Sequence, residues 1–236
     1  MVARFCVGPM ERLTRAHQTF ILAFAAMAIS MIMLVDPVAA HQPIVPRAAN
    51  SIDVTDPTIS KAYYAELKGQ PDTYHITSDA SFPLYLNVLV PAISGVTEDY
   101  TLTIVKDGQP WAVLAPGSEA WKVFDEPFGG DRYLMGPEYR QGVPSGHYDV
   151  VVSSPDNVGK YVLSVGEIES FPMSEILRTM TTMVAVKQYF GKPAIAVLES
   201  PFISVPLVVV LLTIVAVTWL ILLMRRRRSQ RTETVA

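Results

Sequence analysis

The sequence predicts an all-β antiparallel sandwich of jelly-roll-like character, followed by a juxtamembrane amphipathic helix and one C-terminal transmembrane helix. Short runs of alternating apolar residues fill the middle of the chain, which is typical of strands with one buried face. A run with helical spacing comes next. Residues 203–224 then contain no charged side chain and stand directly before the four arginines at 225–228. These three observations divide the chain into an exported domain, a connector and an anchor.

Residues 1–40 are predicted to form a secretory signal peptide. Three arginines precede the apolar run at 19–35, and the small residues at 38–40 fit a cleavage site. Cleavage there would make His41 the first residue of the mature protein. An uncleaved N-terminal anchor is the alternative, because the basic segment is long for a signal peptide. Both alternatives export the middle of the chain.

The exported β-sandwich is expected over residues 41–170, with 41–50 as an extended lead-in. Apolar and polar residues alternate most clearly over 82–90, which indicates a half-buried strand. Gly, Pro, Asp and Asn separate the runs, as in the turn at Asp107-Gly108. Seven or more short strands with turn signals between them favour a sandwich. Strands are expected over 52–54, 59–67, 73–77, 82–90, 100–104, 111–114, 148–152 and 161–165.

Charge and cysteine content exclude several classes of function. Between His41 and Pro201 the chain carries 11 basic and 19 acidic residues, a net charge of −8. An acidic exported domain argues against a nucleic-acid partner. The sole cysteine, Cys6, precedes the apolar run, so the exported part has no thiol. Disulfides, zinc–thiolate sites and cysteine catalysis are therefore excluded there.

The segment 171–202 is predicted to hold an amphipathic juxtamembrane helix and a connector. Apolar residues over 172–190 follow helical spacing, Pro172 suits a first helical position, and Gly191 with Pro193 ends the run. Two alternatives remain for the apolar stripe. It packs on the sandwich or on a second protomer, which would make the protein an oligomer through 172–190, or it lies in the membrane interface.

Residues 203–224 are predicted to span a membrane, because about 20 apolar residues in a helix cross its hydrocarbon core. Arginines collect on the cytoplasmic side of a span, so residues 225–236 form a short basic cytoplasmic tail, too short to fold. The expected localisation is the cytoplasmic membrane, with a single pass and the N-terminal domain outside. Since the connector is short, a protein partner is expected in or near the same membrane.

The segments 145–152 (SGHYDVVV) and 159–165 (GKYVLSV) resemble the closing strands of bacterial pre-peptidase C-terminal-like domains, which are secreted β-sandwiches ending in a Gly-x-Tyr strand pair. The chain as a whole resembles a group of uncharacterised bacterial membrane-anchored proteins, which share a DP-x-ISKAYY-type opening (here 56–64) and a GKYVLSVGE-type close. The resemblance implies a β-sandwich on a stalk. It implies no activity, because such domains usually flank a catalytic domain and none is present here.

Three histidines are candidate metal ligands. A mature N-terminal His41 could chelate Cu²⁺ with its α-amine and imidazole, as in copper-brace proteins, and His75 or His147 could complete the site. This alternative needs cleavage after Ala40 and convergence of the histidines. The competing interpretation makes His75 and His147 ordinary strand residues, since both alternate with tyrosines.

The segment 125–140 (DEPFGGDRYLMGPEYR) is interpreted as a long connecting loop with two possible roles. Its carboxylates on a Gly-bent loop could hold Ca²⁺, although the spacing matches no known calcium loop. Alternatively, they form salt bridges with Arg132 and Arg140. Aromatic side chains could also contact a sugar or peptide at the loop edge. The candidate ligand-binding residues are Phe128, Asp131, Tyr133 and Tyr139.

No catalytic signature is found in the sequence. It contains no G-x-S-x-G, no H-E-x-x-H and no phosphate-binding glycine loop. The chain is therefore expected to be a non-enzymatic, membrane-anchored extracytoplasmic binding or interaction module, acting as an accessory subunit or ligand-binding scaffold without a required cofactor. The alternative is an exported copper-binding protein that uses His41.

Overall fold

The computed structural model describes residues 41–46, 50–116, 121–170 and 172–233. The predicted signal peptide lies outside these residues. By its internal contacts the chain forms two units, one over Ala39–Ile203 and one that includes Ser204 onward. The first unit holds the sandwich and the connector, and the second holds most of the C-terminal helix.

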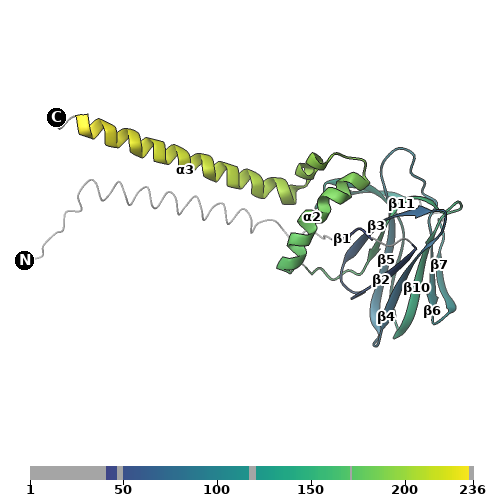
Figure 1. Cartoon of the computed structure of the whole chain (residues 1–236). Helices are drawn as coiled ribbons and strands as arrows, with labels where there is room; N and C mark the ends of the chain where they lie inside the picture. The colour runs from purple at the N-terminus through teal and green to yellow at the C-terminus, as the bar shows by residue number, and fades with distance from the viewer. Residues whose placement is uncertain (1–40, 47–49, 117–120, 171, 234–236) are drawn as a thin grey trace, which may run out of the picture. The chain divides into compact units, whose positions relative to one another are not determined.

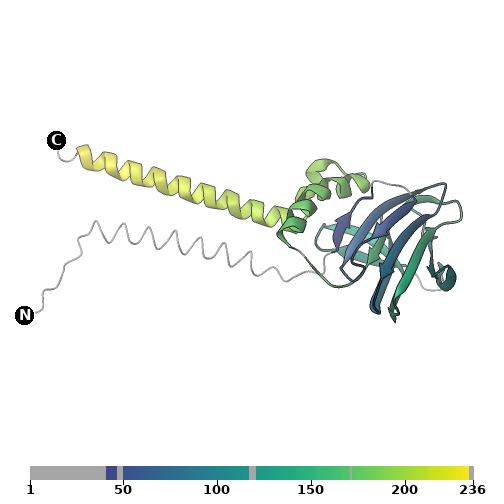
Figure 2. The same cartoon turned by 60° about the horizontal axis from the view of Figure 1, so that its bottom comes forward.

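The sandwich predicted from the sequence is confirmed, with its strands in two sheets (Figures 1 and 2). In spatial order, the first sheet contains β1 (Gln42–Ile44), β3 (Lys61–Lys68), β11 (Val158–Val165), β5 (Phe82–Pro91), β9 (Asp131–Val143) and β8 (Lys122–Glu126). The second sheet contains β2 (Ser51–Val54), β4 (Asp72–Ser78), β10 (Gly146–Ser153), β6 (Thr101–Lys106) and β7 (Gln109–Leu114).

The strand pairs are antiparallel, as predicted, except at one edge of each sheet. Strand β1 pairs in parallel with β3, and β2 pairs in parallel with β4. The first two strands along the chain, β1 and β2, are therefore short edge strands, one in each sheet. Each of these strands joins a partner two strands later in the chain, and this crossover connection makes the pairs parallel.

The core lies between the sheets and consists of the inward members of each alternating run. Leu84, Leu86 and Val88 of β5 are almost fully buried, as the alternation predicts. Polar atoms in this core are paired: the Tyr161 hydroxyl donates to Asp72 at 2.5 Å and lies 2.9 Å from the Tyr74 hydroxyl. Pairing matters because an unpaired polar group in such a core would cost stability.

The segment 125–140 is not a loop, which corrects the prediction. Strands β8 and β9 form an antiparallel hairpin, with Phe124 opposite Tyr133, and β9 runs on to Val143. The glycines that suggest a loop have local roles. A Cβ on Gly136 would lie 2.5 Å from the ring of Trp121, so this glycine makes room for the indole within a strand.

The predicted connector helix is present as α2 (Met173–Tyr189). Gly191 ends it with φ of 71° and donates to the Gln188 carbonyl, while the N–H of Lys192 donates to the Lys187 carbonyl. This is a Schellman motif, which explains why glycine follows the helix. A 3₁₀ helix, η1 (Ala194–Glu199), comes next.

The outer face of the first sheet is covered by α2 (Figure 1). Met183 and Val186 of the helix and Phe190 at its C-terminal cap are 1–6% exposed. They pack on that face of the sheet, where Tyr64 of β3 and Tyr133 of β9 lie. The apolar stripe thus packs on the sandwich, which is the first of the two alternatives for this helix.

The C-terminal helix α3 spans Pro201–Glu233. Its part Pro201–Met224 contains an 18-residue window with a mean hydropathy of 3.0 and is long and apolar enough to cross a membrane. The helix begins two residues before the predicted span and continues through the four arginines. The backbone is therefore helical as far as Glu233.

Candidate functional site

A buried lysine joins the connector to the β8–β9 hairpin. The ammonium of Lys187 is fully buried and donates to the Gly129 carbonyl at 2.7 Å and to Asp131 Oδ2 at 2.8 Å. The ammonium of Lys192 donates to Asp131 Oδ1 at 2.9 Å and to Glu199 at 2.6 Å. We call Lys187, Asp131, Lys192 and Glu199 the Lys187 cluster. It links α2, η1 and the first residue of β9.

The hairpin turn contributes further contacts to this junction. The carboxylate of Glu126 accepts the backbone N–H groups of Phe128 at 2.7 Å and Gly129 at 2.5 Å. Burial raises the pKa of Glu126, and these two hydrogen bonds oppose the shift. The Ser200 hydroxyl donates to the Phe128 carbonyl at 2.6 Å, and the Phe128 and Phe202 rings lie 4.5 Å apart.

The four residues predicted to bind a ligand do not converge on one surface. Phe128 and Asp131 belong to the junction with η1. Tyr133 is 2% exposed beneath α2 and lies 2.9 Å from the Tyr64 hydroxyl. Tyr139 belongs to the core between the sheets, where its hydroxyl accepts the Trp111 indole N–H at 2.8 Å. Strict alternation would put Tyr133 and Tyr139 on one face of β9, because they are six positions apart. A β-bulge in β9, opposite Asn87 to Leu89, reverses the alternation and places the two tyrosines on different faces, which a loop interpretation could not show.

The carboxylates considered for calcium are paired with other groups. Asp125 binds Arg132 at 2.6 Å, and Glu138 lies 3.6 Å from Arg140. Asp131 is neutralised by the two lysines of the Lys187 cluster. These contacts match the salt-bridge alternative. Asp125, Glu126, Asp131 and Glu138 do not gather as a metal-binding group within the described ranges.

A small cavity lies between α2 and the outer face of the first sheet. Its volume is about 30 Å³, and its walls include Tyr64, Leu89, Ser164 and Met183. The Ser164 hydroxyl is buried without a hydrogen-bond partner among the described residues. Since a water needs about 10–15 Å³ of such volume, the cavity has room for roughly two waters. It is too small for a larger ligand.

His41 lies beside this cavity and apart from the other two histidines. Its Nδ1 contacts the Ser60 hydroxyl, and burial lowers its pKa to about 4. A copper brace would use this same Nδ1. His75 and His147 come together elsewhere, so the structure does not bring the three predicted metal ligands to one place.

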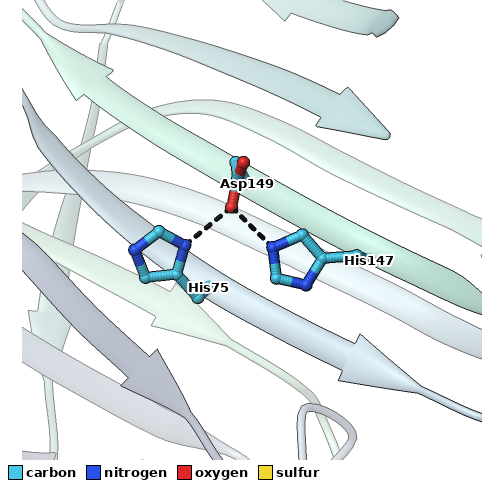
Figure 3. Close-up of side chains that lie close together, drawn as sticks. All are labelled: His75, His147 and Asp149. Atoms are coloured by element: carbon cyan, nitrogen blue, oxygen red, sulfur yellow. Dashed lines mark hydrogen bonds and ion pairs between the residues drawn. The ribbon is translucent and has the colours of Figure 1, made fainter. Parts of the chain in front are cut away.

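His75 and His147 meet around Asp149 on the outer face of the second sheet (Figure 3). His75 Nδ1 lies 2.7 Å from Asp149 Oδ1, and His147 Nε2 lies 3.1 Å from the same oxygen. The imidazole rings are nearly parallel, with centroids 6.0 Å apart. We call these three residues the His–Asp–His cluster.

Two hydroxyl groups complete the surroundings of the cluster. Ser51 Oγ lies 3.0 Å from His75 Nε2, and Thr77 Oγ1 lies 3.0 Å from His147 Nδ1. Both ring nitrogens of His75 and both ring nitrogens of His147 therefore have an oxygen partner. The arrangement can hold protons, can ligate a cation, and on one side shows the Ser–His–Asp connectivity of a hydrolase triad.

Asp149, Lys187, Thr77 and Ser51 are not predicted from the sequence, although it carries a signal for the first two. Asp149 stands two positions after His147 on a strand, and such residues share a face. Lys187 follows Met183 by four positions and therefore falls on the apolar stripe of the helix. The pairing of β4 with β10 brings Thr77 into place, and that of β2 with β4 brings Ser51.

The described fold has low similarity to solved structures. The pre-peptidase C-terminal domain of a collagenase from Bacillus anthracis matches 51% of this chain and 95% of its own, with 14% identity and a TM-score of 0.30. A β-glucosidase from Paenibacillus barengoltzii matches 55% of this chain, which spans only 14% of that enzyme, with 7% identity and a TM-score of 0.26. No protein-family model and no curated protein matches the chain.

Proposed function

We propose that this protein is a single-pass membrane protein that displays a non-enzymatic binding module on the extracytoplasmic side, as an accessory subunit or ligand-binding scaffold. The observation that carries the proposal is the helix Pro201–Met224, which contains an 18-residue window with a mean hydropathy of 3.0, only 6% of it buried. A helix that apolar and that exposed is suited to lipid. The four arginines after it favour a cytoplasmic C-terminus.

The connector supports display close to the membrane. Lys187, Lys192 and Ser200 all bond to the β8–β9 hairpin or its turn, and the apolar helix begins at the next residue, Pro201. Among the described residues, only Ser200 stands between η1 and that helix, and its hydroxyl is bonded to the hairpin turn. A partner in or near the same membrane fits this short connection.

The second sheet offers the face for binding. The outer face of the first sheet is covered by α2, whereas outward side chains of the second sheet remain accessible, including His147 at 49% and His75 at 31%. A binding module needs such an uncovered face with polar groups that fix orientation.

Membrane extraction tests the anchor. The double variant Leu212→Arg, Ile214→Arg places two charges in the middle of the apolar helix, at a cost of about 2.5–3.5 kcal/mol each. We expect the unaltered protein to stay in the membrane pellet after alkaline carbonate treatment, and the double variant to be extracted. The matched control Val113→Arg, on an exposed strand position, should stay in the pellet. An unaltered protein that is fully extracted would overturn the proposal.

A further inference from the structure

We propose that the His–Asp–His cluster is a binding site for one divalent late transition-metal ion, Zn²⁺ or Cu²⁺. The three ligand atoms are His75 Nδ1, His147 Nε2 and a carboxylate oxygen of Asp149, and all lie within 4.8 Å of one another. Bonds of about 2.0–2.2 Å to a tetrahedral ion place its ligand atoms roughly 3.4 Å apart. The observed 2.7 and 3.1 Å contacts need only a small opening to admit the ion.

The sheet holds the three ligands in position before any ion binds. Asp149 is directly opposite His75 in the antiparallel pair of β10 and β4, and His147 is opposite Thr77. Strand β10 lies between β4 and β6 in the middle of the sheet, so its backbone is bonded on both sides. Ligands on rigid strands lose little conformational freedom on binding.

The two hydroxyls allow the imidazoles to change tautomer. Without an ion, His75 donates from Nδ1 to Asp149 while its Nε2 accepts from Ser51. With an ion on Nδ1, the proton moves to Nε2 and donates to the same Ser51 oxygen. For His147 the nitrogens are exchanged: Nε2 faces Asp149 or the ion, and Nδ1 exchanges the hydrogen bond with the Thr77 hydroxyl. A ligating histidine commonly donates its second N–H to such a partner, and a hydroxyl can accept or donate.

Charge and exposure also suit a cation. Two neutral imidazoles and one carboxylate give a net charge of −1, in a domain that is itself acidic. The side chains are 31–49% exposed, so a hydrated ion can reach them and water can fill a fourth position. Nitrogen with one oxygen is a donor set that Zn²⁺ and Cu²⁺ accept, whereas Ca²⁺ and Mg²⁺ prefer oxygen alone.

The hydrolase alternative explains less of the cluster. A Ser–His–Asp triad uses one histidine, yet Asp149 Oδ1 contacts both imidazoles, and His147 has a hydroxyl of its own. An acyl-transfer site also needs N–H donors for the oxyanion. The backbone N–H of His147 already donates to Asp107. Metal ligation gives a role to every member of the cluster.

This inference names a ligand for the exposed face of the second sheet and does not depend on the membrane anchor. A failed metal test would leave the anchoring proposal intact, and failed membrane anchoring would leave the metal site intact.

Calorimetry on the full chain tests the site. The protein is purified in detergent with a tag that lacks histidine, stripped with a chelator, and titrated with Zn²⁺ and separately with Cu²⁺. We expect one equivalent of ion to bind, and each of the variants His75→Ala, His147→Ala and Asp149→Asn to weaken binding at least about tenfold. The Cu²⁺ complex should show two nitrogen donors by electron paramagnetic resonance.

Matched variants separate the outcomes. His41→Gln, away from the cluster, should bind the ion as tightly as the unaltered protein, and metal-free melting temperatures should show that the cluster variants fold. Ser51→Ala should weaken binding by less than the ligand variants. Full-strength binding in the double variant His75→Ala, His147→Ala would overturn the proposal, as would no binding by the unaltered protein. So would labelling by a serine-directed fluorophosphonate that Ser51→Ala abolishes.

Discussion

Lys187 is the side chain on which the junction between the connector and the sandwich depends most. Its ammonium is fully buried, and it faces the Gly129 carbonyl and the Asp131 carboxylate. Removing a charge from water is costly, and only a partner at hydrogen-bond distance offsets that cost. Lys192 donates a second hydrogen bond to Asp131, so each oxygen of the carboxylate accepts from one ammonium group.

Replacing Lys187 with methionine should strongly destabilise the unit that holds the sandwich and the connector. The variant leaves the buried Asp131 carboxylate with Lys192 as its remaining cation, and breaking a buried pair typically costs about 3–5 kcal/mol. Chemical denaturation of the detergent-solubilised protein measures the free energy of unfolding. Lys68→Met is the matched control, because Lys68 makes an exposed pair with Glu66 that is worth about 1 kcal/mol or less. Equal losses in the two variants would contradict the role assigned to Lys187.

His41 should make stability depend on pH. Burial lowers its pKa to about 4 in the folded protein, from 6.5. Between these values the unfolded chain binds a proton that the folded chain does not. The free energy of unfolding should therefore fall as the pH drops from 6.5 towards 4, by up to about 1.4 kcal/mol per pH unit from this group.

The substitution His41→Asn isolates that contribution. Denaturation curves at several pH values between 4 and 7 would be compared for the two proteins. The difference in unfolding free energy between them should change across this window and stay constant above pH 7. A difference that is the same at every pH would show that His41 titrates alike in both states.

Helix α2 is held to the first sheet by its apolar stripe. Phe190 packs edge-to-face with Tyr133 at 5.1 Å between ring centroids and is 6% exposed, whereas Met180 is 43% exposed. Phe190→Ala should therefore lower the free energy of unfolding by about 3–5 kcal/mol. Met180→Ala should change it by less than about 0.5 kcal/mol.

Protection of α2 from hydrogen exchange provides the second measurement of this packing. Amides of the helix should exchange faster in Phe190→Ala than in the unaltered protein, while amides of β10 keep their protection. If Met180→Ala proved the more damaging of the two, the helix would instead use its exposed side, as the oligomer prediction for 172–190 requires.

Strands with strict alternation were predictable from the sequence. The strand expected over 82–90 is β5, and those expected around Tyr148 and Tyr161 are β10 and β11. Strand β9 was missed because Gly130, Gly136 and Pro137 resemble loop signals. Gly130 and Gly136 make room for groups that are distant in the sequence. A Cβ on Gly130, for example, would lie 2.8 Å from the carbonyl oxygen of Glu199, and no local sequence pattern indicates such a contact.

The candidate site was predictable only in part. His75 and His147 were singled out as metal ligands from their residue type. Their meeting depends on the register between β4 and β10, and His75 and Asp149 are 74 positions apart. Register between distant strands is set by the whole packed sheet, which a single sequence does not reveal. His41 is predicted to join them by residue type alone, whereas it stands directly before β1 of the first sheet.

At the level of the whole molecule, a β-sandwich, a connector that is hydrogen-bonded to it and an apolar helix follow one another in one chain. The sandwich and the connector form one unit, Ala39–Ile203, and the apolar helix starts at its end. The distribution of charge, with 19 acidic and 11 basic residues before Pro201 and four arginines after Met224, fits opposite sides of a membrane.

Cysteine accessibility tests this topology most directly, because Cys6 is the sole native cysteine. In a Cys6→Ser background, Val113→Cys places a thiol on an exposed position of the sandwich, and Ser229→Cys places one after the arginines. The account predicts that a membrane-impermeant maleimide labels Val113→Cys in intact spheroplasts and labels Ser229→Cys only after the membrane is opened. Labelling of Ser229→Cys in intact spheroplasts, with Val113→Cys protected, would contradict it.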